Sequence, residues 1–254
     1  MNRTVLTLPV RAAKPRSRGL TMVIDGGLPL GHFTDLIELG AEYIDYVKFG
    51  WGTSVITGCL REKIAVLDSW GIGFYFGGTL FEKFVLQGRF DDYRRFCAEY
   101  SCRHVEASNG TIELSNAEKA GYIRKLAPDF CVVSEVGFKD PGRSEMLAPS
   151  EWIAAIREDL EAGASLVTLE ARESGKSGIC RPDGELRYGL IEDVLHAGTD
   201  LDKLLFEAPT TALQTHMISR IGPDVNLGNV PATGVIGLET LRLGLRSDTL
   251  TTFE

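Results

Sequence analysis

The sequence predicts an α/β protein built as a single (β/α)8 barrel of the TIM type. Short apolar, β-branched segments alternate strictly with segments of helical period, and no linker rich in proline or serine interrupts them. Eight such units in 254 residues match the size of a closed barrel. An open doubly wound sheet is the competing fold. It is disfavoured because the turn after the first strand reads "DGGLPLG" and lacks the G-x-G-x-x-G pattern.

The predicted strands are the short apolar runs. They are LTMVID (20–25), YIDYVKF (43–49), IGFYF (72–76), RHVEAS (103–108), FCVVSEV (130–136), SLVTLEA (165–171), KLLFEA (203–208) and DVNLGN (224–229). Residues 1–18 precede the first strand, so we expect an arm outside a catalytic barrel domain of residues 19–254, with a neighbouring subunit as one surface on which the arm could lie.

The segments between these strands have the period and the ends of helices. Examples are LREKIAVLDSW, SNAEKAGYIRKLA, SEWIAAIREDLEAG and IGLETLRLGLR. Several begin after serine or proline and end at glycine, as helix caps prefer. Helices between successive strands predict a parallel sheet with covering helices.

Composition excludes several classes of function. A net charge of −8 and a pI near 5.2 argue against a nucleic-acid surface. No apolar run approaches the roughly 18 residues of a membrane-spanning helix. The five cysteines are scattered and include no C-x-x-C pair, which fits a reducing setting. We therefore expect a cytoplasmic protein that binds neither nucleic acid nor membrane.

Nearly every predicted strand ends on a functional group. The set comprises Asp25, Lys48, Gly77, Gly78, Thr79, Glu106, Asn109, Glu135, Lys139, Glu170, Arg172, Glu207, Asn226 and Asn229. Any one of these residues could merely cap a helix or pair with a neighbour at the rim. In a barrel, however, the carboxyl ends of the strands converge on the face that carries active sites. The convergence of the whole set predicts an enzyme.

The residue types at these ends suit metal-assisted chemistry on an anion. No histidine stands at a strand end, which argues against a Ser-His-Asp triad and a histidine zinc site. Clustered carboxylates suit Mg²⁺, with Mn²⁺ as an alternative. The cations Lys48, Lys139, Arg172 and Lys176 suit a phosphorylated, carboxylated substrate. The expected chemistry is a metal-stabilised enolate with a lysine as proton donor.

The segment ESGKSG (173–178) resembles part of a phosphate-binding P-loop. A P-loop requires a glycine five residues before Gly175, where Glu170 stands. We interpret the segment instead as a loop after the sixth strand that carries Arg172 and Lys176 over the substrate.

Eight segments, in order and from about residue 18 to 249, closely resemble the phosphosulfolactate synthase family. They are RGLTMVID, YIDYVKFGWGTS, YFGGTLFE, SEVGFKD, LEARESGK, FEAP, VNLGN and LETLRLGLRSDT. The resemblance implies a (β/α)8 barrel in a homo-oligomer, a trimer in the family's known architecture. It also implies Mg²⁺-dependent addition of sulfite to phosphoenolpyruvate.

The resemblance also suggests roles for individual residues. The family's proposed general acid is the second lysine of an "EVGKK" segment, which falls on Lys139, with Phe138 in place of the first lysine. Lys48 and Glu135 join Lys139 as expected catalytic residues, and Glu173 is a further matched position. Expected substrate and phosphate ligands are Arg172, Ser174, Lys176, Gly78, Thr79, Asn226, Gly228 and Asn229. Expected metal ligands are Asp25, Glu106, Glu170 and Glu207.

Three departures from the family pattern bear on the substrate. The family's "DKGL" has Gly26 in place of the lysine, its "EISDG" has Asn109 in place of the aspartate, and its "QKSQQ" corresponds to residues 210–214, which lack the lysine. Three hypotheses therefore remain: a phosphosulfolactate synthase proper, a diverged enzyme joining phosphoenolpyruvate or a similar enol to a bulkier partner in specialised metabolism, and a noncatalytic stress-associated protein.

Overall fold

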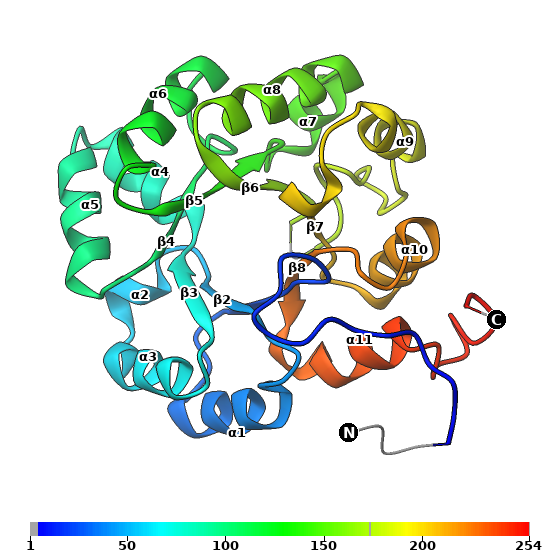
Figure 1. Cartoon of the computed structure of the whole chain (residues 1–254). Helices are drawn as coiled ribbons and strands as arrows, with labels where there is room; N and C mark the ends of the chain where they lie inside the picture. The colour runs from blue at the N-terminus through cyan, green and yellow to red at the C-terminus, as the bar shows by residue number, and fades with distance from the viewer. Residues whose placement is uncertain (1–4, 173, 254) are drawn as a thin grey trace.

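The computed structural model describes residues 5–172 and 174–253 and confirms the (β/α)8 barrel. The strands form one parallel barrel wall around a central axis (Figure 1). They are β1 (Thr21–Asp25), β2 (Tyr46–Phe49), β3 (Gly73–Phe76), β4 (His104–Ala107), β5 (Cys131–Val136), β6 (Ala164–Leu169), β7 (Leu204–Glu207) and β8 (Leu227–Pro231).

Hydrogen-bonded strand pairs run in the order β3-β2-β1-β8-β7-β6-β5-β4, so β3 and β4 are the two ends of the ladder. The register places Lys48 beside Tyr75, Glu135 beside Thr168 and Glu207 beside Gly228. Because every pairing is parallel, all strands end on the same face of the barrel. Polar groups at the strand ends are thereby brought together, although they lie far apart in the sequence.

Helices surround the wall and separate successive strands (Figure 1). They are α1 (Leu30–Gly40), α2 (Thr53–Ile56), α3 (Leu60–Ser69), α4 (Gly78–Leu86), α5 (Phe90–Glu99), α6 (Asn116–Leu126), α7 (Pro141–Met146), α8 (Pro149–Glu161), α9 (Tyr188–His196), α10 (Thr211–Ile221) and α11 (Val235–Arg242). Two short 3-10 helices, η1 (Leu201–Lys203) and η2 (Ala232–Gly234), adjoin β7 and β8. Among the described residues, no helix is long and apolar enough to cross a membrane.

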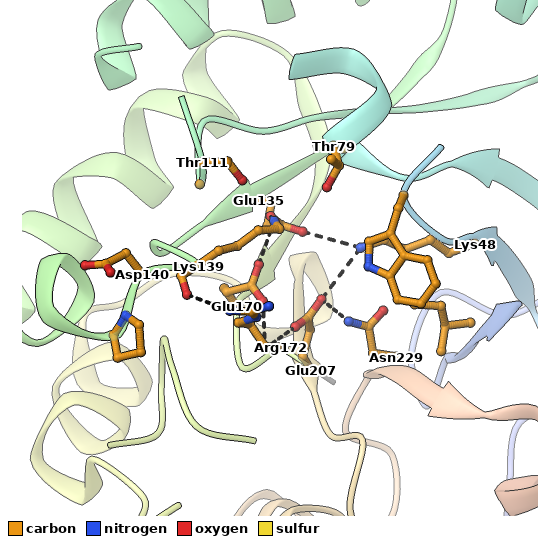
Figure 2. Close-up of a pocket in the computed structure, with 15 residues that line it drawn as sticks. Lys48, Thr79, Thr111, Glu135, Lys139, Asp140, Glu170, Arg172, Glu207 and Asn229 are labelled. Carbon is orange, nitrogen blue, oxygen red and sulfur yellow. Dashed lines mark hydrogen bonds and ion pairs between the residues drawn. The ribbon is translucent and has the colours of Figure 1, made fainter. Parts of the chain in front are cut away.

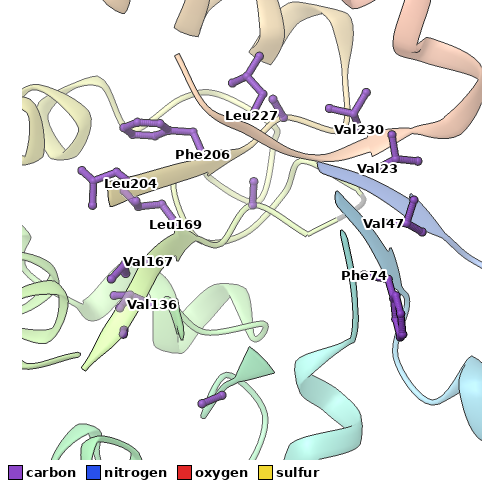
Figure 3. Packing of buried hydrophobic residues seen from close by; sticks show 14 of the residues in the cluster. Val23, Val47, Phe74, Val136, Val167, Leu169, Leu204, Phe206, Leu227 and Val230 are labelled. Atoms are coloured by element: carbon purple, nitrogen blue, oxygen red, sulfur yellow. The ribbon is translucent and has the colours of Figure 1, made fainter. Parts of the chain in front are cut away.

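The larger core lies between the strands and the helices, where side chains such as Val47, Val167 and Phe206 are buried (Figure 3). A smaller cluster of Met22, Tyr75, Val133 and Leu205 fills the barrel interior. Residues two positions further along a strand point to the same side. Glu135 follows Val133 and Glu207 follows Leu205, so this interior cluster forms the apolar floor beneath two of the polar strand ends.

The eighth strand begins three residues later than predicted, at Leu227 instead of residue 224. Asn226 therefore lies at the amino end of the barrel wall. Its side chain accepts from the backbone N–H of Leu20 at 2.9 Å and donates to the carbonyls of Asp202 and Leu204 at 3.1 and 3.0 Å. These bonds tie the starts of three neighbouring segments together, on the face opposite the polar strand ends.

Residues 5–18 pack against the barrel of their own chain. Arg11 forms ion pairs with Asp224 and Glu239, and Arg16 pairs with the buried Asp45 at 2.8 Å. Lys14 donates to the carbonyl of Ala41 at 2.9 Å. The arm is thus held by charged contacts close to the amino ends of β1 and β2.

Candidate active site

A cavity of about 420 Å³ opens at the carboxyl ends of the strands (Figure 2). Its position agrees with the general location of active sites in this fold. It is lined by Ile24, Lys48, Trp51, Gly78, Thr79, Gly110, Thr111, Glu135, Lys139, Asp140, Pro141, Glu170, Arg172, Glu207 and Asn229.

Lys48 is the buried cation of the cavity floor. Its Nζ lies 2.9 Å from Glu106 Oε1, 3.3 Å from Glu135 Oε2 and 3.6 Å from Glu207 Oε1. Burial alone would lower the pKa of Lys48, but the surrounding carboxylates hold this pKa well above its ordinary value. Lys48 is therefore positively charged at neutral pH.

Lys139 is the second cation, and it lies beside Glu135 and Glu170 (Figure 2). Its Nζ contacts Glu135 Oε1 and lies 3.0 Å from Glu170 Oε2, and its side chain is 21% exposed. Burial opposes the charge, but Glu135 and Glu170 hold the pKa of Lys139 well above its usual range. The ammonium group is thus protonated while it remains accessible from the cavity.

Carboxyl groups outnumber lysines in this cluster, since Glu106, Glu135, Glu170 and Glu207 lie around Lys48 and Lys139. Burial raises the pKa of Glu106 to about 7, despite the attraction of Lys48. Burial, together with nearby carboxylates, also raises the pKa of Glu170 well above its ordinary range. Burial alone would raise the pKa of Glu135, but Lys139 and Lys48 hold this pKa well below its ordinary value. The cluster therefore binds protons, or another cation, readily.

Three of these carboxylates could hold a metal ion together. Glu135, Glu170 and Glu207 each offer one oxygen, and these atoms lie within 4.8 Å of one another. Glu207 is fixed by the side-chain amide of Asn229 and by the backbone N–H groups of Ala171 and Arg172, at 2.9 and 3.0 Å. An all-oxygen, anionic set fits a hard divalent cation, and such a cation would offset the excess of carboxyl groups over lysines in the cluster.

Two of the expected metal ligands, Asp25 and Glu106, lie outside this group of three. Asp25 pairs with the buried Lys63 of α3 at 2.6 Å and accepts the backbone N–H groups of Gly27 and Leu28, both at 2.8 Å. Its oxygens therefore hold the turn after β1. Glu106 lies beneath the cavity, where it contacts Lys48 and the backbone N–H of Gly78.

Four of the eight expected substrate ligands line the cavity, and four, including Asn226 at the amino end of the barrel wall, do not. Gly78, Thr79, Arg172 and Asn229 line the cavity. Ser174 and Lys176 are exposed and do not line it. Gly228 is buried in β8, where an added Cβ would lie 3.0 Å from Met22 and 3.1 Å from Leu205. The absence of a side chain at Gly228 therefore allows these two residues to pack against the strand. Glu173 lies outside the described residues.

Sequence reasoning did not single out several residues of the cavity wall. These are Trp51, Gly110, Thr111 and Asp140. Trp51 adopts a left-handed backbone with φ of 52°, as do Arg172 (55°) and Asn229 (50°). Such conformations are uncommon for residues other than glycine and gather at functional sites. Trp51 belongs to a segment that resembles the family, but no local pattern marks it as a cavity residue.

Two of the three departures from the family pattern have local structural roles. Asn109 donates to the carbonyl of Leu114 at 2.9 Å, a bond that an ionised aspartate could not make. Thr210 accepts the N–H of Leu213 at the start of α10, and Gln214 donates to the carbonyl of Ala208.

Gly26, the third departure, differs. Its φ is not left-handed, and an added Cβ would meet only the Trp51 ring, at 3.4 Å. A side chain is therefore sterically possible at this position.

Comparison with known proteins agrees with the geometry. Residues 9–248 match the family model described as (2R)-phospho-3-sulfolactate synthase. The phosphosulfolactate synthase of Bacillus subtilis (strain 168) is 49% identical over 249 residues, covering 98% of this chain and 99% of the relative. That of Methanothermobacter thermautotrophicus is 41% identical, covering 98% of each chain.

Among solved structures, 3-hexulose-6-phosphate synthase from Salmonella typhimurium superposes with a TM-score of 0.58. The match covers 87% of this chain and 97% of that chain at 11% sequence identity, so it supports the barrel fold alone. Membership of a family is supported by the family model and the two sequence relatives, because these matches extend over nearly the whole chain. The chain therefore belongs to the phosphosulfolactate synthase family of enzymes.

Proposed function

We propose that this enzyme adds sulfite to phosphoenolpyruvate to form (2R)-phospho-3-sulfolactate. The observation that carries this proposal is the pairing of an accessible ammonium group, Lys139, with a buried carboxylate cluster in one cavity. The sequence relatives, which are named phosphosulfolactate synthase, support the product of this proposed reaction.

Bond changes in this reaction define what the residues must do. Sulfite sulfur forms a bond to the methylene carbon of phosphoenolpyruvate, and the double-bond electrons move onto the adjacent carbon and carboxylate. The phosphate-bearing carbon then takes one proton. Lys139 supplies that proton from Nζ, and Glu135 and Glu170 orient it through their ion pairs.

Cationic and hydrogen-bonding groups around the cavity suit the two anions. Lys48 provides a fixed positive charge in the floor, and Arg172 provides a second at the rim. The hydroxyls of Thr79 and Thr111 lie on the same wall and can donate to phosphate or sulfite oxygens (Figure 2). Charge-assisted contacts of this kind supply orientation as well as affinity.

Glu135, Glu170 and Glu207 would hold the divalent cation, Mg²⁺ or Mn²⁺. When bound, the cation would stabilise the negative charge that develops on the substrate carboxylate. We expect turnover of phosphoenolpyruvate and sulfite to be lost after exhaustive EDTA treatment and restored by Mg²⁺ or Mn²⁺. The free energy of unfolding should also rise, by about 2.7 kcal/mol at a metal concentration 100 times Kd. Full activity in the metal-free protein would contradict the proposal.

Gly26 favours a second candidate function, in which phosphoenolpyruvate or a similar enol is joined to a bulkier partner. The backbone does not require glycine there, and an added side chain would start 3.4 Å from the Trp51 ring. Gly26→Lys should improve sulfite use and impair reaction with a larger partner, because a returning cation favours a compact dianion. The measurement is kcat/KM for sulfite in both proteins. Efficient phosphosulfolactate formation by the unmodified protein would exclude this candidate.

A further inference from the structure

Glu82 is a fully buried carboxyl group that does not line the cavity. It lies on α4, with 1% of its surface exposed. Its Oε1 lies 2.6 Å from the hydroxyl oxygen of Ser108, and its Oε2 accepts the backbone N–H of Thr111 at 3.1 Å. Within residues 5–172 and 174–253, no ion pair joins Glu82 to a lysine or an arginine. Its contacts are thus with the segment that follows β4.

Ser108 links Glu82 to the active site. Its hydroxyl oxygen lies 2.9 Å from Glu135 Oε1, the same oxygen that contacts Lys139 Nζ. It also accepts the backbone N–H of Gly110 at 3.3 Å. Gly110 and Thr111 line the cavity, so one short segment connects Glu82 both to the cavity wall and to the carboxylate beside Lys139.

Counting hydrogens defines the direction of these bonds. A serine hydroxyl has one hydrogen, yet Ser108 lies within hydrogen-bond distance of two carboxyl groups. Glu135 is ion-paired with both Lys48 and Lys139 and is therefore the ionised acceptor. One hydrogen shared between two ionised carboxylates would satisfy neither contact fully, although the Glu82 contact is the shorter of the two. A hydrogen on Glu82, donated to Ser108, would satisfy both contacts.

We propose that Glu82 is a positioning residue that, as a neutral hydrogen-bond donor, fixes Glu135 through the Ser108 hydroxyl. Glu82 donates to Ser108, Ser108 donates to Glu135, and Glu135 holds Lys139 in place. The kinetic consequence rests on the proposed function, because Lys139 is the proton donor only in that reaction. The structural consequence, a fixed Glu135 side chain, does not depend on the substrate.

Three variants test this role: Glu82→Gln, Glu82→Met and Ser108→Ala. Glutamine can donate its amide hydrogen to Ser108 and accept from Thr111, whereas methionine has a similar length and can do neither. We expect Glu82→Gln to retain most of kcat. Glu82→Met and Ser108→Ala should each lower kcat about 10–100-fold with a smaller change in KM. The double variant Glu82→Met/Ser108→Ala should be no worse than either alone, because both changes break one chain of contacts.

Two further measurements test the positioning role of Glu82 independently of the proposed reaction with sulfite. Mn²⁺ affinity, measured by calorimetry, should fall in Glu82→Met and be kept in Glu82→Gln. Crystal structures should show Glu135 against Lys139 in the glutamine variant and displaced in the methionine variant. Equal effects of glutamine and methionine, or additive losses in the double variant, would overturn the positioning role. If the unmodified protein fails to use phosphoenolpyruvate and sulfite but the structures differ as expected, the proposed function fails and this role stands.

Discussion

Lys139→Ala is expected to lower kcat by about 10²–10⁴-fold, the range for loss of a positioned general acid. The reason is geometric: Lys139 Nζ is protonated, 21% of the side chain is exposed, and Glu135 and Glu170 hold it in the cavity wall. Lys48 is a weaker candidate because it is buried in the cavity floor and surrounded by three carboxylates.

Two controls distinguish proton donation from the loss of a charge. Lys139→Arg keeps a positive charge, but guanidinium does not release its proton in proteins. This variant should therefore keep much of the substrate binding, read from KM, while kcat falls. Lys83→Ala removes an exposed lysine of α4 that does not line the cavity and should leave both constants unchanged. If kcat for Lys139→Ala is near normal, the proton comes from elsewhere, with Lys48 the next candidate.

The barrel could be predicted from the sequence because its signals are local. Apolar runs such as residues 131–136 and 204–207 alternate with helical segments, and each strand needs only its own composition to be recognised. The convergence of Lys48, Glu135 and Glu207 then follows from parallel pairing alone. The exact ends of strands are less certain from sequence, and a shift of three residues at β8 was enough to misplace Asn226.

The division of labour among the carboxylates depends on contacts that no local pattern reveals. Asp25 and Glu207 both end a strand, yet Asp25 meets Lys63, which approaches from α3, 38 positions away in the sequence. Glu82 and Ser108 are likewise brought together from different units of the barrel. The role of each carboxylate depends on which side chain reaches it from a neighbouring helix or loop. These contacts form only in the folded chain, so the local sequence does not predict them.

The second large effect is expected for a substitution at Gly178, the last residue of the segment ESGKSG. The sequence analysis interprets this segment as a loop after the sixth strand and not as a P-loop. Gly178 has φ of +66°, and a Cβ at this position would overlap the carbonyl oxygen of Glu170. That carbonyl also accepts the N–H of Ile179 at 2.8 Å, so the loop after β6 is folded directly onto the backbone of a cavity residue. Gly178→Ala cannot be accommodated unless this backbone moves.

Gly175→Ala is the matched control for Gly178→Ala. Gly175 lies in the same loop with nearly the same φ of +62°, but its nearest contact from an added Cβ would be Leu213 at 3.5 Å. The free energy of unfolding of Gly175→Ala should fall by only about 1–2 kcal/mol, the cost of placing alanine in a left-handed conformation. Gly178→Ala adds overpacking and should lower the free energy of unfolding by about 3 kcal/mol or more.

The kcat of Gly178→Ala should also fall further than that of Gly175→Ala, because Glu170 and Arg172 are displaced with the backbone. Urea unfolding and steady-state kinetics on both variants provide the comparison. Equal losses would mean that left-handed φ, and not close approach to Glu170, explains the glycine.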